Sequence, residues 1–315
     1  MRLRLSKFLV VGVLASALLA TAGSAATTQF ATGMVVPETI TQTASGKFLV
    51  TDATATNDSG QIFSVPAAGG AATSLATTTS TLRGGLILPS SFGTAAGQFL
   101  VVGFDNASGN ATASTMDSSN TLTPYHSQIG GAWTSPVLAP SFGSLSGDVL
   151  LTNQGGPDPG SVDYFTPSGG VGTLATFPSQ VQPFGAALAN SSFGEVGGPS
   201  LFVSNSRGNG IYTVDPAGNI KLFTTIPLDA GQNSLRQIAF APKEWKKYGG
   251  DLFVSVNSGA IDVVNRDGVV IGKISGAFNA RGLLFTTMSG QPTLLFSNTR
   301  NGTILKAGPG DIVPS

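Results

Sequence analysis

A unit of about fifty residues recurs along this chain, and the repeat restricts the fold more than any other sequence feature. Its clearest element is a small turn followed by alternating apolar residues that end in a small polar residue and, in most copies, Asp or Asn. The copies are Gly46–Asp52, Gly97–Val102, Gly147–Asn153, Ser200–Asn205, Gly250–Ser255 and Thr293–Asn298. Anchored at positions 46, 97, 147, 199, 250 and 292, they follow one another at steps of 51, 50, 52, 51 and 42 residues. The chain therefore contains six units.

Each unit holds four short apolar segments with the period-2 alternation of strands. A first strand, running into Pro in most copies, precedes each anchor, as in 34–37, 86–89 and 137–140. Third strands such as 210–215 and fourth strands such as 220–225 follow it. Six four-stranded units predict an all-β, six-bladed β-propeller. A β-sandwich or an open solenoid is the alternative, and the even period fits it less well.

The sixth unit predicts how the ring closes. The chain ends soon after Lys306, which leaves no room for a fourth strand in this unit. The segment Thr28–Thr32 precedes the first unit as fourth strands precede first strands elsewhere. We expect it to join the last blade as its outer strand, which would hide an unpaired sheet edge.

The first 26 residues predict export. Arg2, Arg4 and Lys7 precede an apolar run at 8–20, and small residues follow at 21–26. This order is typical of a cleaved secretory signal, and thirteen apolar residues are short for a bilayer span, which needs about 20. An uncleaved anchor is the alternative. We therefore expect a signal peptide at 1–26 and one propeller domain at 27–315, secreted to the periplasm or the extracellular space and free of the membrane after cleavage.

Composition excludes several kinds of site. Sixteen Lys and Arg balance sixteen Asp and Glu, and charged residues make up only 10 % of the chain, so nucleic acid is not an expected partner. The chain has no cysteine and a single histidine, His126, on a predicted outer strand. Disulfides, Cys-ligated metals and multi-His metal sites are therefore excluded. We expect a monomer.

The unit that contains Pro183–Ala189 and Leu201–Asp215 resembles the NHL-type repeat of secreted six-bladed propellers. It is also similar to the senescence-marker-protein and gluconolactonase superfamily. The resemblance covers nearly all of 27–315, but it lies in the repeat pattern and so bears on fold more than on activity.

Resemblance to the gluconolactonase-like enzymes implies a Ca²⁺ ion in the central channel, held by a Glu, Asn side chains and a catalytic Asp. Glu38, just after the predicted first strand, and Asp52, at the end of the next, loosely match the first of these positions. Asn153 and Asn205 occupy the place of Asp52 in other units, as does Asn298. The family's Glu-Gly opening and Asn-Gly ligand motif are not recognisable here. Asp or Asn after a strand also commonly stabilises a turn, which is the alternative role.

Three arginines recur at one place in the repeat. Arg83, Arg236 and Arg281 all fall where an outer strand passes to the next inner strand. These positions and the loops after the Asp52-like positions should open on one face, around the channel mouth. Converging guanidinium groups would bind a carboxylate or phosphate, since Arg grips such anions with two hydrogen bonds. Bracing of neighbouring blades through loop carbonyls is the alternative.

Two functions follow as hypotheses. The first is a secreted binding or interaction module that holds a small anion, a glycan or a protein at the channel mouth. The second is a calcium-dependent hydrolase of lactones or similar esters, with Glu38, Asp52, Asn153 and Asn205 around the metal. The sequence does not decide whether the protein is an enzyme.

Overall fold

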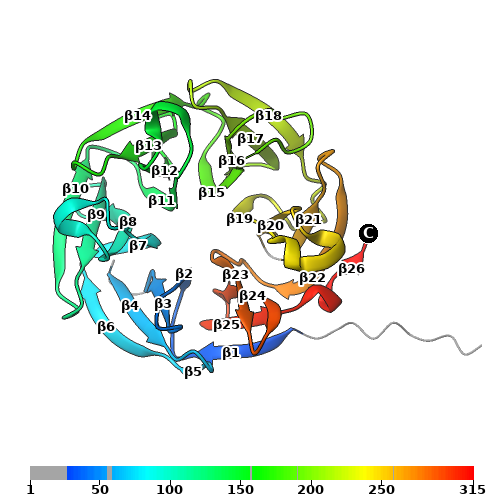
Figure 1. Ribbon diagram of the computed structural model, residues 1–315, viewed down its shortest axis with the longest axis horizontal. Coiled ribbons are helices and arrows are strands. Elements are labelled where there is room, and N and C mark those ends of the chain that lie inside the picture. The colour runs from blue at the N-terminus through cyan, green and yellow to red at the C-terminus, as the bar shows by residue number, and fades with distance from the viewer. Residues whose placement is uncertain (1–26, 55–58, 157, 190, 258) are drawn as a thin grey trace, which may run out of the picture.

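The computed structural model describes residues 27–54, 59–156, 158–189, 191–257 and 259–315. The predicted signal peptide at 1–26 lies outside these ranges. Six antiparallel sheets surround a common axis as the blades of a six-bladed propeller (Figure 1). The predicted all-β fold is confirmed. In the described part of the chain no helix is long and apolar enough to cross a membrane.

Every blade starts with an inner strand at the axis and runs outward. Blade 1 contains β2 (Pro37–Gln42), β3 (Phe48–Asp52), β4 (Gly60–Val65) and β6 (Thr73–Thr78). Blade 2 contains β7 (Ser80–Ile87), β8 (Phe99–Asp105), β9 (Asn110–Met116) and β10 (Leu122–Gln128). Blade 3 contains β11 (Trp133–Leu138), β12 (Val149–Asn153), β13 (Ser161–Phe165) and β14 (Val171–Thr176). Blade 4 contains β15 (Pro183–Ala189), β16 (Ser200–Asn205), β17 (Gly210–Val214) and β18 (Ile220–Thr225). Blade 5 contains β19 (Leu235–Phe240), β20 (Leu252–Val256), β21 (Gly259–Val264) and β22 (Val270–Ala277). Blade 6 contains β23 (Leu283–Met288), β24 (Gln291–Asn298) and β25 (Thr303–Ala307). Short 3-10 helices are η1 (Gly93–Ala95), η2 (Gly143–Leu145), η3 (Lys243–Tyr248) and η4 (Pro309–Asp311).

The ring closes as predicted. Strand β1 (Thr28–Thr32) pairs antiparallel with β25 and supplies the outer strand of blade 6 (Figure 1). Two further pairings were not anticipated. The two-residue β5 (Gly70–Ala71) runs parallel to β1, and the terminal β26 (Val313–Pro314) adds a fifth strand to blade 5 beside β22. Both ends of the described segment, 28–32 and 313–314, are therefore paired with strands of neighbouring sheets.

The hydrophobic core lies between the blades rather than within any one of them. Leu100 and Val102 of β8, for example, pack with Val149 and Leu151 of β12 in one cluster. The aromatic residue that follows the inner strand in several units is buried in the same layer; the set comprises Phe92, Phe142, Phe193 and Trp245. Since each sheet needs its neighbours to cover both faces, adjacent blades stabilise one another.

The inner strands share a bulge near their first residues. Pairing breaks register after Pro37, Leu82, Thr134, Pro183 and Leu235 in β2, β7, β11, β15 and β19 respectively. Backbone N–H groups freed by the bulge donate to a buried hydroxyl of the second strand; Gly185 N donates to Ser204 Oγ (2.9 Å) and Thr39 N to Thr51 Oγ1 (3.1 Å). Such bulges redirect side chains, here toward the axis.

In blade 1 the predicted first strand, residues 34–37, was wrong. Strand β2 begins at Pro37 instead of ending there, because Pro lacks an N–H and is accepted as a first strand residue. The N–H groups of Val35 and Val36 donate to Asp52 Oδ2, at 2.8 and 3.0 Å, and not to a strand partner. Glu38 therefore lies inside the inner strand and not after it.

Candidate functional site

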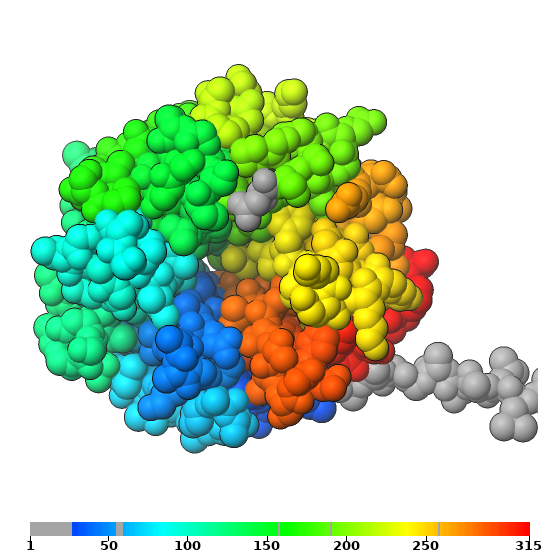
Figure 2. All heavy atoms as spheres, viewed as in Figure 1, coloured from blue at the N-terminus to red at the C-terminus, as the bar shows by residue number. Residues whose placement is uncertain are grey.

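One position of the repeat gathers the charged residues at the axis. In each of five blades, a residue near the start of the inner strand pairs with the Asp52-like residue of the second strand, and the position in question directly follows that inner-strand residue. The pairs are Pro37 with Asp52, Leu82 with Gly103, Trp133 with Asn153, Pro183 with Asn205 and Leu235 with Val256. In blade 6 the corresponding residue is Arg281, which stands two residues before Leu283, the partner of Phe296, as Glu38 stands two residues before Ile40, the partner of Val50. The six residues, here called the axial ring, are Glu38, Arg83, Thr134, Phe184, Arg236 and Arg281. All lie at or directly before the starts of the inner strands, which surround the axis, and Figure 2 shows a hollow at the centre of the disc.

Glu38 joins two of the three arginines. Its Oε1 accepts a hydrogen bond from Arg83 Nη1 at 2.7 Å and a second, short one from Arg281 Nη1. The Glu38 side chain is fully buried, whereas those of Arg83 and Arg281 keep 20 % and 18 % of their surface exposed. An anion entering the channel would therefore meet guanidinium groups and not the carboxylate.

Arg236 is the third cation and has no carboxylate partner of its own among the described ion pairs. The pKa of Arg236 is lowered to about 10, chiefly by burial and next by the charge of Arg281; Glu38 opposes the lowering, and Arg83 adds a smaller one. Its guanidinium lies over the ring of Phe184, 5.4 Å from the centroid, which fixes its direction. A buried, unpaired cation is unfavourable unless a ligand compensates it.

The axial ring rests on closely packed backbone. A Cβ on Gly185 would come within 2.4 Å of Arg236 O, and one on Gly282 within 2.5 Å of Glu38 O, so only glycine lets these neighbouring inner strands approach. One residue further along the inner strands, Ser135 Oγ of blade 3 donates to Gln237 Oε1 of blade 5 at 2.6 Å. This bond spans blade 4 and narrows the channel next to Arg236.

Each of the four residues that resemblance suggests as calcium ligands has one side-chain oxygen engaged in other hydrogen bonds, and of their oxygens only Glu38 Oε2 and Asp52 Oδ1 are buried without a partner among the described residues. Asp52 Oδ2 accepts two backbone N–H groups and Glu38 Oε1 two guanidinium N–H groups. Asn153 Oδ1 accepts from Ala132 N and Gly155 N; Asn205 Oδ1 accepts from Gln182 N and Arg207 N. Ca²⁺ requires six to eight free oxygen ligands, and three adjacent cations would repel it. As arranged, these residues do not fit a calcium site.

Asp52 itself anchors a loop. Burial raises the pKa of its carboxyl, the N–H bonds of Val35 and Val36 partly offset this, and the nearby Glu38 charge raises it further. Over the described ranges, no three His, Cys, Asp or Glu side chains gather closely enough to hold a metal ion.

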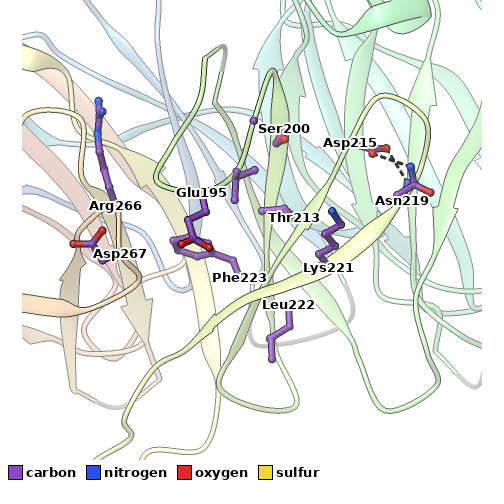
Figure 3. Close-up of a pocket in the computed structure, with 12 residues that line it drawn as sticks. Glu195, Ser200, Thr213, Asp215, Asn219, Lys221, Leu222, Phe223, Arg266 and Asp267 are labelled. Atoms are coloured by element: carbon purple, nitrogen blue, oxygen red, sulfur yellow. Dashed lines mark hydrogen bonds between the residues drawn. The ribbon is translucent and has the colours of Figure 1, made fainter.

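Other features lie apart from the axis. His126 is on the outer strand β10, beside Tyr125 and Phe165. A surface cavity of about 520 Å³ lies between blades 4 and 5, toward the opposite ends of the inner strands (Figure 3). There Asp215 turns to Asn219 within its own hairpin, and Glu195, Lys221 and Arg266 make no common cluster. The axial ring remains the candidate site.

No family model matches the sequence, and no curated protein matches it. Solved structures do resemble it. A regucalcin described as a calcium-binding protein from Agrobacterium tumefaciens shares 15 % identity with a TM-score of 0.64, over 89 % of this chain and 95 % of that one. A gluconolactonase from Xanthomonas campestris shares 13 % (TM-score 0.61; 91 % and 88 %). An auxiliary nutrient binding protein from Bacteroides thetaiotaomicron shares 9 % (TM-score 0.63; 90 % and 70 %).

At these identities the likeness concerns the fold alone. The neighbours comprise an enzyme and binding proteins, so one scaffold carries different functions. The chain is a six-bladed β-propeller that resembles the regucalcin and gluconolactonase structures at low sequence identity.

Proposed function

We propose that this protein is a secreted binding module that holds a small anionic ligand at the mouth of its central channel. The observation that carries the proposal is the convergence of Arg83, Arg236 and Arg281 on one axial position, where Glu38 pairs with Arg83 and Arg281 but not with Arg236 among the described ion pairs. Guanidinium groups bind carboxylate and phosphate oxygens through paired, charge-assisted hydrogen bonds. Closely packed blades hold these side chains in place before the ligand arrives, which lowers the entropic cost of binding.

The Nε atoms of the three arginines support the same reading. Each is buried without a hydrogen-bond partner in the described structure, as is Glu38 Oε2. Buried polar groups are rarely left unpaired, and an entering anion could accept hydrogen bonds from these donors.

The test is anion binding by calorimetry with the wild type and the double variant Arg236→Ala, Arg281→Ala. We expect the double variant to lose at least about tenfold in affinity for a small carboxylate, since two charge-assisted contacts disappear. The matched control is Arg266→Ala, which removes an arginine from the cavity between blades 4 and 5. Equal affinity in wild type and double variant would contradict the proposal.

The second candidate, a calcium-dependent hydrolase of lactones or esters, draws on the likeness to a gluconolactonase. Thermal melting with Ca²⁺ and with a chelator separates the two. A rise of several degrees with Ca²⁺ that Asp52→Ala abolishes, together with lactone turnover, would favour the hydrolase, because a ligand of the folded state raises its apparent stability. A melting temperature that does not change with Ca²⁺ would favour the binding module over the hydrolase.

A further inference from the structure

The charges of the axial ring do not cancel. Three guanidinium groups meet one carboxylate, so the ring carries three positive charges and one negative charge, an excess of two. Glu38 is fully buried between Arg83 and Arg281 and is already used by both. The uncompensated charge is therefore concentrated at Arg236 and on the faces of Arg83 and Arg281 that point away from Glu38.

The charged residues of the axial ring also lie on one side of the axis. Going round the axis, the charged residues belong to blades 5, 6, 1 and 2, while blades 3 and 4 contribute Thr134 and Phe184. Thr134 Oγ1 donates to Phe184 O at 2.7 Å, so this neutral side is satisfied internally. An anion must bind on the charged half, with Phe184 directing the guanidinium of Arg236 toward it.

Neighbouring charges lie outside this count. Asp52 interacts with Glu38, but none of the arginines is its hydrogen-bond partner. Burial raises the pKa of Asp52 despite the N–H bonds of Val35 and Val36, and this favours the neutral form of its carboxyl. Arg207 and Arg300, on loops at the same ends of the strands, are exposed, so solvent and salt screen them.

From this excess we infer that the ligand carries two negative charges, as a dicarboxylate or a phosphate monoester does. The inference rests on the proposed function and adds the ligand class. A dianion neutralises the ring, a monoanion leaves one buried positive charge, and a trianion adds an unpaired negative one; both latter states carry a desolvation penalty. The affinity should therefore peak at two charges.

A ligand series on one carbon skeleton tests the inference. Butyrate, glutarate and tricarballylate are propane with one, two and three carboxylates, and calorimetry at about pH 8 and constant ionic strength compares them. We expect wild-type protein to bind glutarate about tenfold more tightly than butyrate, and tricarballylate no more tightly than glutarate. Inorganic phosphate, a dianion at this pH, shows whether both charges are best placed on one group or on two.

Variants that change the charge of the ring sharpen the test. Arg236→Met lowers the excess to one, and glutarate should lose its advantage over butyrate. Glu38→Gln raises it to three, and tricarballylate should become the tightest ligand. Asp52→Asn is the control and should leave the preference at two. Should Glu38→Gln not fold, Arg236→Met still decides.

The outcomes separate the two claims. Equal binding of all three acids by the wild type, or a preference shifted by Asp52→Asn, overturns the dianion while the anion-binding function stands. Failure of every acid and of phosphate to bind overturns both.

Discussion

At the scale of single residues, Arg236 differs from its two counterparts. Arg83 and Arg281 each share a carboxylate, whereas Arg236 is a partly buried cation held by an aromatic face and flanked by like charges. Such a group lowers the stability of the fold, and proteins commonly keep strain of this kind where a ligand relieves it.

Replacing Arg236 by Met, which has similar length and no charge, is therefore expected to stabilise the ligand-free protein. Because the pKa of Arg236 falls to about 10 in the fold, we expect a gain on the order of 1 kcal/mol after allowance for its partial exposure. Arg281→Met, the matched change, should lose stability, since it takes one of two partners from the buried Glu38. Chemical denaturation measures both. A loss with Arg236→Met would show that this side chain braces the blades.

At the scale of strands, blades 3 and 5 carry an aspartate at the same place on their third strands. Asp163 of β13 lies opposite Leu151, and Asp262 of β21 opposite Val254. The Asp163 carboxylate accepts hydrogen bonds from four side chains, namely Trp133, Asn153, Ser161 and Thr173. Burial raises the pKa of Asp262 to about 6, the charge of Lys273 opposes this, and Asp229 adds to it. One buried carboxylate is thus fully satisfied and the other is not.

This contrast between the two aspartates predicts that the free energy of unfolding depends on pH. The folded state holds the Asp262 proton up to about pH 6, while the unfolded chain releases it near pH 4, so the free energy of unfolding falls as pH rises through this window. Asp262→Asn should remove that fall and gain up to roughly 3 kcal/mol relative to wild type between pH 4 and pH 7. Asp163→Asn should instead be destabilising across the window, because it disturbs four bonds. Denaturation curves at several pH values measure both, and a constant difference for Asp262→Asn contradicts the prediction.

The sequence was sufficient to predict the six blades, but not to predict which six residues make up the axial ring. Apolar alternation and turn residues suffice for six units and for the strand that closes them, because both follow from local patterns. Alignment of the units on the recurring Pro placed Glu38 after the first strand. Pro37 in fact begins β2, whereas Pro89 and Pro140 come after the ends of β7 and β11. Only the pairing of Pro37 with Asp52 shows that Glu38 and Arg83 are equivalent. The small polar residue before most of the Asp52-like positions was visible, but its hydroxyl bond to the backbone of the inner strand was not.

At the scale of the whole molecule, the closing strand makes the six blades one cooperative unit. Phe30 and Ala31 of β1 are buried in the cluster that also holds Phe48 and Leu295, so this strand joins blades 1 and 6. A closed ring leaves no free inner edge and places the axial residues at fixed separations.

Removal of residues 28–32 should therefore cost several kcal/mol, because it takes Phe30 from the core and exposes the edge of β25. Removal of 313–315, which takes away the exposed strand β26, is the matched control and should cost much less. Melting temperature and light scattering measure the outcome, with self-association expected for the first truncation only. Equal melting of the two truncations would falsify the role assigned to β1.

The pairing of β1 with β25 also fixes an order of events during folding. Residues 28–32 leave the ribosome before the other strands of the ring, and their partners at 303–307 follow the strands of blades 1 to 5. Blades 1 to 5 can assemble during synthesis, but blade 6 cannot be finished until residues 303–307 have been made. Since the charged residues of the axial ring belong to blades 1, 2, 5 and 6, the proposed anion site is fixed in place only when the ring closes. A chain that lacks 303–307 would hold most of the hydrophobic layers but would not fix the axial ring.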